Sequence, residues 1–277
     1  MFDLGKIYTV IGGIAEERGI RAYAVGGFVR DLLMRRESVK DLDVVVEGSG
    51  IEFARWFDEK VEAEGSLVEF SDFDTARYVY TTEDEEGHKH TVFELEFAGA
   101  RSEIYDELSR KPKVSTTTLH EDLTRRDFTV NAIALPIGVN GLGSEVVDPF
   151  DGAIDIEKKI LRTPLDPDIT FSEDPLRMMR AARFASQLGF TIEHHTYDAI
   201  ARNRSRLKIV SKERICEEFF KLLATPVPSV GLYILYNTGL INEFLPEVSE
   251  LNGVEELYGH QHKNNLVHTF KVVDNIA

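Results

Sequence analysis

Two aspartates stand at the start of a run of three valines, and this combination constrains the fold more than any other feature of the chain. Asp41 and Asp43 precede the valines at 44–46. An apolar run of this kind is typical of a strand buried on both faces. Residues two apart on a strand point to the same face, so the two carboxylates are expected side by side. A buried strand carries such a pair at low cost only where the acids are paired or bind a metal.

A glycine pair, Gly26 and Gly27, precedes this strand and opens an expected helix over 27–36. Glycine lets backbone N–H groups at the start of a helix approach a phosphate closely. Paired carboxylates can hold two Mg²⁺ ions, which lie about 3.5–4 Å apart in two-metal phosphoryl-transfer sites. Each half alone is common, because most Asp-x-Asp sequences are surface pairs and most Gly-Gly sequences are turns. Together they indicate a site that handles nucleotides.

Composition and length suit a soluble globular protein with more than one domain. The chain has 277 residues, of which 43% are hydrophobic and 29% are charged. It contains no run of 18 apolar residues, so we predict no membrane span. The N-terminus lacks the apolar core of a signal peptide, and one cysteine excludes an intramolecular disulfide, so the cytoplasm is the predicted location. Cys216 lies in an apolar helical run and is expected to be a packed thiol.

The net charge of −16 is unusual for a protein that binds nucleic acid, but the charge is unevenly distributed. Acids crowd residues 58–107, and bases concentrate in 101–126, 162–183 and 202–214. The last of these stretches predicts a patch that binds RNA phosphates. The alternative is a solvated helix end and loop. The basic residues of this stretch are Arg202, Arg204, Arg206, Lys208, Lys212 and Arg214.

The order of expected elements predicts an α+β fold, with a mixed-sheet head followed by an all-α neck and body. Strands are expected at 22–25, 41–47, 66–70, 76–81 and 91–98, with 82–90 as a hairpin loop. Helices are expected at 4–18, 27–36, 51–64, 173–188, 195–203, 211–224, 227–238 and 240–245. Ser172 is the expected cap of the helix that begins at Glu173, and Gly189 ends it. We predict three parts, a head at 1–158, a neck at 159–225 and a body at 226–277.

The sequence around residue 95 alternates strictly between apolar and acidic residues. Glu94 and Glu96 therefore share one face of a strand, and the apolar residues 93, 95 and 97 share the other. One interpretation is an ordinary strand with a hydrated face. The other is that one of these acids joins Asp41 and Asp43.

Several stretches resemble one enzyme family. Residues 26–31 together with Asp41 and Asp43 resemble the first motif of the class II (bacterial-type) tRNA nucleotidyltransferases and poly(A) polymerases, in the polymerase-β-like superfamily. Four further stretches match in the same order. They lie at 125–132, 148–152, 173–184 and 211–215. The resemblance extends over about residues 20 to 225.

The resemblance implies a polymerase-β-like head in which Asp41 and Asp43 bind two Mg²⁺ ions. It places the third carboxylate at Glu96, as a metal ligand or proton acceptor. The family more often has Thr-Phe-Arg where this chain has Gly-Ala-Arg at 99–101, which affects the assignment of Glu96. The nucleotide-binding residues that the resemblance implies are Gly26, Gly27, Arg30, Arg126, Asp174, Arg177, Arg180 and Arg183. Asp127 and Asn131 are expected to hold their loop in shape.

Asp174 and Arg177 form the expected base-reading pair. An acid accepts a hydrogen bond from the amino group of cytosine or adenine, and an arginine donates to ring nitrogens or a carbonyl oxygen. Such a pair selects cytosine and adenine over uracil and guanine. The alternative is a simple salt bridge between the two residues.

The implied activity is metal-dependent addition of CMP and AMP, from CTP and ATP, to the 3′ end of tRNA. The runners-up are a poly(A) polymerase and an A-only or CC-only adding enzyme. A rival from another class is a non-catalytic RNA-binding module. His260, His262 and His268 resemble the opening of an HD-type phosphohydrolase domain, but its His-Asp dyad does not follow, so no metal is assigned to them.

Overall fold

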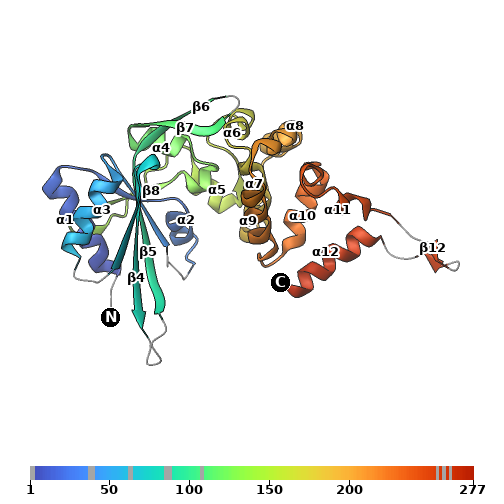
Figure 1. Cartoon of the computed structure of the whole chain (residues 1–277), viewed down its shortest axis with the longest axis horizontal. Helices are drawn as coiled ribbons and strands as arrows, with labels where there is room; N and C mark the ends of the chain where they lie inside the picture. The colour runs from blue at the N-terminus through green and yellow to red at the C-terminus, as the bar shows by residue number, and fades with distance from the viewer. Residues whose placement is uncertain are drawn as a thin grey trace. The chain divides into compact units, whose positions relative to one another are not determined.

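The computed structural model describes residues 4–36, 41–61, 65–83, 89–106, 109–253, 256–257, 260–261 and 264–277. The chain forms two compact units, which are described separately below (Figure 1). Unit 1 contains residues 1–104 and 113–156, and unit 2 contains residues 105–112 and 157–277. The part boundaries at 158 and 225 remain predictions from the sequence.

Among the described residues of unit 1, seven strands form a mixed sheet in the order β3-β4-β5-β2-β1-β8-β9. The strands are β1 (Ala22–Val25), β2 (Asp41–Val46), β3 (Gly65–Phe70), β4 (Thr75–Glu83), β5 (Lys89–Gly99), β8 (Ala134–Gly138) and β9 (Gly141–Leu142). Strands β2 and β5 are parallel, and the other neighbours are antiparallel. The predicted mixed-sheet α+β head is therefore confirmed. Residues 84–88 of the predicted hairpin loop lie outside the described residues.

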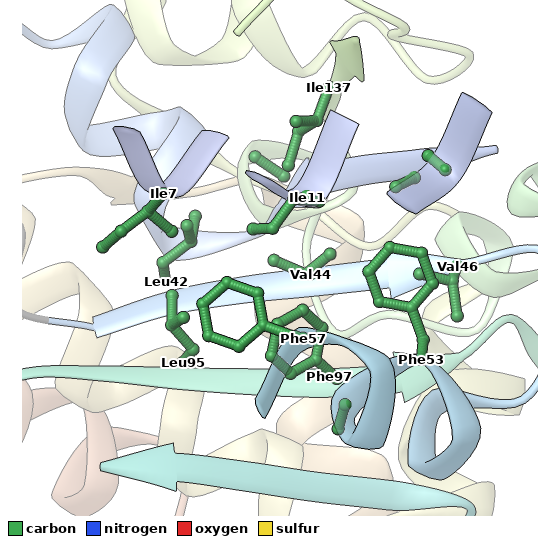
Figure 2. Close-up of a cluster of buried hydrophobic side chains, with 14 of the residues drawn as sticks. Ile7, Ile11, Leu42, Val44, Val46, Phe53, Phe57, Leu95, Phe97 and Ile137 are labelled. Atoms are coloured by element: carbon green, nitrogen blue, oxygen red, sulfur yellow. The ribbon is translucent and has the colours of Figure 1, made fainter. Parts of the chain in front are cut away.

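Helices α1 (Leu4–Arg18) and α3 (Gly50–Lys60) cover one face of this sheet (Figure 1). Alternate apolar residues of β2 and β5, such as Val44 and Leu95, point toward them. Figure 2 shows the resulting core, formed by Ile7 and Ile11 of α1, Phe53 and Phe57 of α3, and Leu42, Val44, Val46, Leu95, Phe97 and Ile137 of the strands. Each fully buried side chain of this size contributes about 1.5–3 kcal/mol. This packing fixes which face of β2 carries the aspartates.

The opposite face of the sheet is covered in part by α4 (Leu119–Thr124). Leu119 and Leu123 of this helix pack with Val25 and Val45 of the sheet. The strict alternation of β2 puts Asp41 and Asp43 on this face, since Leu42 lies in the core on the other side. The face therefore has an apolar part under α4 and a part that carries acids.

Shorter elements complete unit 1. Helix α2 spans Gly27–Leu33 and ends earlier than the predicted residue 36. The turn η2 spans Thr129–Asn131, and α5 spans Gly152–Lys158 at the division between the units. Strands β6 (Arg101–Asp106) and β7 (Ser109–Thr116), which belong partly to unit 1 and partly to unit 2, form a two-stranded sheet that the sequence analysis did not predict.

Unit 2 is mainly helical. Its helices are α6 (Pro167–Glu173), α7 (Leu176–Leu188), α8 (His194–Asn203), α9 (Lys212–Leu223), α10 (Pro228–Asn237), α11 (Glu247–Glu250) and α12 (Asn265–Ile276), with the 3₁₀ turns η3 (Arg204–Ile209) and η4 (Leu240–Glu243). The two-residue strands β10 (Ile160–Leu161) and β11 (Thr191–Ile192) pair, as do β12 (Glu256–Leu257) and β13 (His260–Gln261). These four two-residue strands are the additions to the predicted helical neck and body. Within the part of the chain that the structure describes, no helix is long and apolar enough to cross a membrane.

The predicted helix 173–188 corresponds to α7, which begins three residues later than predicted. Helix α6 ends at Glu173, and α7 begins at Leu176. Pro175 disfavours a helical conformation of the residue before it, and Asp174 is accordingly extended. Ser172, the predicted cap, lies inside α6, and Asp166 caps that helix instead. The predicted stop at Gly189 is confirmed by its left-handed conformation.

The expectation for Cys216 is wrong, because its thiol is exposed. Helix α9 buries one face, formed by Ile215, Glu218 and Leu222. Cys216 lies outside this i, i+3, i+7 stripe, so the neighbouring apolar residues do not enclose it.

Candidate active site

Strands β2 and β5 place acids in two adjacent pairs. In the parallel register of these strands, Asp41 lies beside Glu94 and Asp43 lies beside Glu96. On the other side of β2, Asp43 lies beside Val25 of β1. All four acids occupy the sheet face opposite the core of Figure 2. The prediction that Glu94 and Glu96 share a face is thereby confirmed.

Asp43 is the most perturbed acid of this group. It reaches solvent, but protein atoms crowd around it, and this desolvation raises the pKa of its carboxyl to about 6. The charge of Arg126 opposes the increase, and the charges of Glu96 and Asp41 add to it. A carboxylate held among other acids in this way gains by binding a cation.

Arg77 is a residue of this face that the sequence analysis missed. It lies beside Glu96 in the register of β4 and β5. Its Nη2 is 3.2 Å from Oε2 of Glu96, and its Nη1 is 3.8 Å from Oε2 of Glu94. The signal was available, because an antiparallel hairpin around residues 82–90 brings residue 77 opposite these acids.

The donor set fits Mg²⁺ in one respect, since it consists of carboxylate oxygens on one face. Among the described residues, however, no group of three or more His, Cys, Asp or Glu side chains is arranged to hold a metal ion. Mg²⁺ usually binds proteins through one or two carboxylates and completes its shell with water and substrate phosphates. Asp41 and Asp43 therefore fit a metal that shares its shell with a nucleotide better than they fit a preformed cage.

The glycine turn lies next to Asp43. Gly26 has a φ of 72°, in the left-handed region. A Cβ added to Gly26 would lie 2.9 Å from Nη1 of Arg126 and 3.7 Å from Oδ2 of Asp43. The absence of a side chain at Gly26 thus leaves space between its backbone, the guanidinium of Arg126 and the carboxylate of Asp43. Gly27 follows as the first residue of α2.

Asp122 anchors Arg126. The Nε and Nη2 atoms of Arg126 donate to Oδ2 of Asp122 at 3.2 and 3.0 Å, and Arg125 donates to Oδ1 of the same carboxylate. Asp122 is fully buried, and this burial alone would raise the pKa of its carboxyl. The two arginines outweigh it and hold the pKa below its usual value. The two hydrogen bonds to Oδ2 of Asp122 leave Nη1 of Arg126 on the side of Gly26.

Arg30 is buried beneath the glycine turn. Its Nη1 donates to Oδ1 of Asn131 at 2.7 Å, and its Nε donates to Asp31 at 2.9 Å. Nδ2 of Asn131 in turn donates to Oδ1 of Asp127 at 3.0 Å. Asp127 and Asn131 hold their loop together as expected. A direct contact of Arg30 with phosphate remains a prediction.

In unit 2, Asp174 joins α6 to α7. Its Oδ1 accepts a hydrogen bond from the backbone N–H of Leu176 at 3.1 Å, and its carbonyl accepts one from Arg177 at 3.0 Å. Its Oδ2 is 4.0 Å from Nη2 of Arg214. The side chain of Arg177 is nearly buried, with Nη1 3.6 Å from Glu173 and 3.4 Å from the carbonyl of Thr170.

Arg180 and Arg183 lie further along α7 and pack on one aromatic ring. Their guanidinium carbons are 5.2 and 4.0 Å from the ring centre of Phe184. Arg183 also pairs with Glu218 of α9 and donates to Gln187 at 2.7 Å. These contacts hold Arg183 in place on the helix.

The basic stretch 202–214 is interleaved with carboxylates. Arg202 pairs with Asp168 at 2.7 Å, and Lys208 lies 3.3 Å from Glu243, which is also 3.8 Å from Arg204. The Nη2 of Arg206 donates to the carbonyl of Ser172 at 2.8 Å. Lys212 and Arg214 begin α9 and are exposed. The stretch is cationic but locally neutralised, so its role in RNA binding remains a prediction.

The C-terminal histidines give no metal centre among the described residues. His268 is exposed on α12, and the backbone of His260 belongs to β13. His262 lies outside the described residues.

Comparison with known proteins identifies two matching regions. Residues 22–162 match the family described as the poly A polymerase head domain. Residues 189–251 match a family described as the probable RNA- and SrmB-binding site of polymerase A. The first region contains the acidic face and the glycine turn, and the second contains the basic stretch.

Similar proteins include two CCA-adding enzymes. The one from Geobacillus sp. is 38% identical over 242 residues, covering 86% of this chain and 52% of the relative. The one from Pediococcus pentosaceus is 38% identical over 232 residues, covering 83% of this chain and 53% of the relative. The chain thus spans about half the length of these curated relatives.

Two solved structures are similar to this chain in fold. The apo form II of a CCA-adding enzyme aligns with a TM-score of 0.73 at 28% identity, covering 89% of this chain and 56% of that one. A tRNA nucleotidyltransferase complexed with a primer tRNA and an incoming ATP analogue aligns with a TM-score of 0.68 at 31% identity, covering 87% and 66%.

Proposed function

The chain belongs to the family of the poly A polymerase head domain, and on this premise we propose that it adds nucleotides to the 3′ end of an RNA. The proposal rests on the acids of strands β2 and β5. Asp41 and Asp43 share one face of the sheet, and Glu96 lies beside Asp43. In the reaction, the 3′ oxygen of the RNA forms a bond to the α-phosphorus of a nucleoside triphosphate. The bond from that phosphorus to the β-phosphate bridging oxygen breaks, and pyrophosphate leaves.

Asp41 and Asp43 are the proposed ligands of two Mg²⁺ ions. When bound, the ions neutralise phosphate charge and acidify the attacking hydroxyl. Glu96, which lies beside Asp43 in the strand register, is the proposed third metal ligand or the proposed acceptor of the proton from that hydroxyl. The raised pKa of Asp43 is consistent with the assignment, because desolvation and then the neighbouring acids disfavour its charged form, and a bound cation would favour it.

Arg126 and the glycine turn are the proposed triphosphate site. Arginine supplies a planar fork of donors suited to phosphate oxygens. Asp122 fixes that fork on two atoms and leaves Nη1 beside Gly26, close to Asp43. Arg30 supports the turn from beneath through Asn131.

Asp174 and Arg177 are the proposed base-reading pair in unit 2, assisted by Arg180 and Arg183. The cap that Asp174 forms on α7 fixes one carboxylate oxygen and orients the other. CTP and ATP are therefore the proposed substrates, and addition of CCA to tRNA is the proposed outcome. CCA-adding enzymes are among the relatives found, which favours this outcome over poly(A), A-only or CC-only addition.

The test uses the purified chain with tRNA transcripts that lack CA or CCA and with each labelled nucleoside triphosphate separately. CCA addition predicts that CMP alone extends both transcripts, and that labelled AMP enters them only after unlabelled CTP is added as well. Long A-tracts without CMP would instead identify a poly(A) polymerase. The variant Arg55→Ala serves as a control and should incorporate nucleotides like the wild type, because Arg55 pairs with Glu69 on the face of the sheet opposite the acids. Binding of tRNA without any incorporation would identify a non-catalytic RNA-binding module.

A further inference from the structure

One row of side chains crosses the acidic face of the sheet from strand to strand. The registers place Val68 of β3 beside Arg77 of β4, Arg77 beside Glu96 of β5, and Glu96 beside Asp43 of β2. Arg77 thus stands between the outer strand and the acids. Arg126 approaches Asp43 from the other side, at Gly26.

The pairs that Arg77 forms are exposed. The side chains of Arg77, Glu96 and Glu94 are 46%, 41% and 37% accessible to solvent. Ion pairs in this environment contribute little to folding stability. Their effect is expected on the electrostatics and side-chain positions of the acidic face.

The position of Arg77 bears directly on metal binding. Like charges that lie side by side on neighbouring strands repel, and Asp43 and Glu96 form such a pair. Arg77 draws Glu96 toward β4, and the described acids form no group of three around one metal position. Arg77 also adds a positive charge close to the position where a cation would bind.

We propose that Arg77 is a positioning residue that holds Glu96 away from Asp41 and Asp43 until a nucleotide arrives. It thereby weakens the binding of a bare divalent cation and couples metal binding to nucleotide binding. This inference rests on the proposed function, because it takes Asp41 and Asp43 as the metal ligands.

The experiment measures Mn²⁺ binding to the nucleotide-free chain by electron paramagnetic resonance. Arg77→Ala removes one positive charge several ångströms from a divalent ion, so Mn²⁺ should bind roughly three- to tenfold more tightly. Arg77→Lys keeps the charge and should stay close to the wild type. Adding Glu96→Gln to Arg77→Ala should abolish most of the gain, because the released carboxylate is then missing.

Arg55→Ala is the matched control. It removes an arginine from another exposed ion pair of unit 1, with Glu69, and should leave Mn²⁺ affinity unchanged. Equal affinity in wild type and Arg77→Ala, or binding by neither, would overturn the proposal. An equal increase in Mn²⁺ affinity in Arg55→Ala would also overturn it, because the increase would then come from the net charge of the protein and not from the position of Arg77.

Asp43→Asn separates this inference from the proposed function. If Mn²⁺ binds Asp43→Asn as tightly as it binds the wild type, the proposed metal site is wrong. If Asp43→Asn loses binding while Arg77→Ala binds like the wild type, only the role of Arg77 is wrong.

Discussion

Asp122→Asn should destabilise unit 1 more than any change to an exposed ion pair. Asp122 is fully buried and accepts hydrogen bonds from both Arg125 and Arg126. The substitution keeps the volume of the side chain but removes its charge. The NH₂ group of the new asparagine also faces guanidinium N–H groups, so two hydrogen-bond donors meet where an acceptor stood. Hydrogen bonds to charged groups contribute about 1.5–3 kcal/mol each, and breaking a buried pair costs about 3–5 kcal/mol. The two arginine side chains retain 18–19% exposure, so water recovers part of this loss.

We therefore expect a loss of about 2–3 kcal/mol in the free energy of unfolding, or roughly 4–12 °C in Tm. Thermal and urea unfolding of the purified chain measure it. Asp168→Asn, which removes the acid of the exposed pair with Arg202, is the control and should cost at most about 1 kcal/mol.

The pH dependence provides a second test of Asp122. Its pKa is lowered in the folded protein, so the folded state binds fewer protons than the unfolded state. Its stabilising contribution is therefore present above about pH 4 and is lost as the pH falls through the lowered pKa. The difference between wild type and Asp122→Asn should be constant from about pH 5 to 8 and should shrink below about pH 4. Equal stability at neutral pH, or a difference that grows on acidification, would refute the reasoning.

Three further predictions concern the proposed site. Gly26→Ala should lower the free energy of unfolding by about 1–2 kcal/mol and raise the KM for nucleotides. An alanine is strained at a φ of 72°, and its Cβ would meet Arg126. Unfolding curves measure the first effect and initial rates measure the second. Asp43→Asn should raise the Tm of EDTA-treated protein at pH 7 by roughly 1–3 °C while abolishing nucleotide addition. Because the pKa of Asp43 is raised, the folded protein loses stability as the pH rises from about 4 to 6 and the carboxyl ionises. Asparagine avoids this loss, and the solvent exposure of Asp43 keeps the expected increase in Tm small. Asp174→Ala should lose roughly ten- to a hundredfold of the preference for CTP and ATP over UTP and GTP. Relative incorporation of the four nucleotides tests it, and unchanged ratios would contradict base reading by Asp174.

Short-range periodicity predicted most elements of unit 1. The alternation in β5 predicted that Leu95 and its apolar neighbours lie on one face and that Glu94 and Glu96 lie on the other, and Leu95 is in the core. The expected helix at 4–18 matches α1, and the expected strand at 22–25 matches β1. These patterns hold because one face of each element is buried in a single core.

The sequence-based predictions failed where the position of a residue depends on a partner distant in sequence or on the backbone restriction of a proline. Arg77 gains its place from the pairing of β4 with β5, which its own neighbours in sequence do not reveal. Pro175 keeps Asp174 extended, so the helix expected from residue 173 begins only at Leu176, after a separate helix α6 that the sequence analysis did not predict. Cys216 was judged from neighbouring apolar residues, whereas the packing of α9 chose a different face. The carboxylates that pair with the basic stretch, such as Glu243 and Asp168, are also distant in sequence, while the role of the stretch in RNA binding stays a prediction.

The central claim is that Asp41 and Asp43 support metal-dependent transfer of a nucleotide. The most direct measurement is incorporation of one labelled CMP into a tRNA transcript lacking CCA, with Mg²⁺ varied. Wild type and Glu69→Gln, which alters an acid of the exposed pair with Arg55, should incorporate CMP equally and only with Mg²⁺. Asp41→Asn and Asp43→Asn should remain folded and bind the transcript but incorporate none. Incorporation at the wild-type rate by either aspartate variant, or by wild type in EDTA, would contradict the claim.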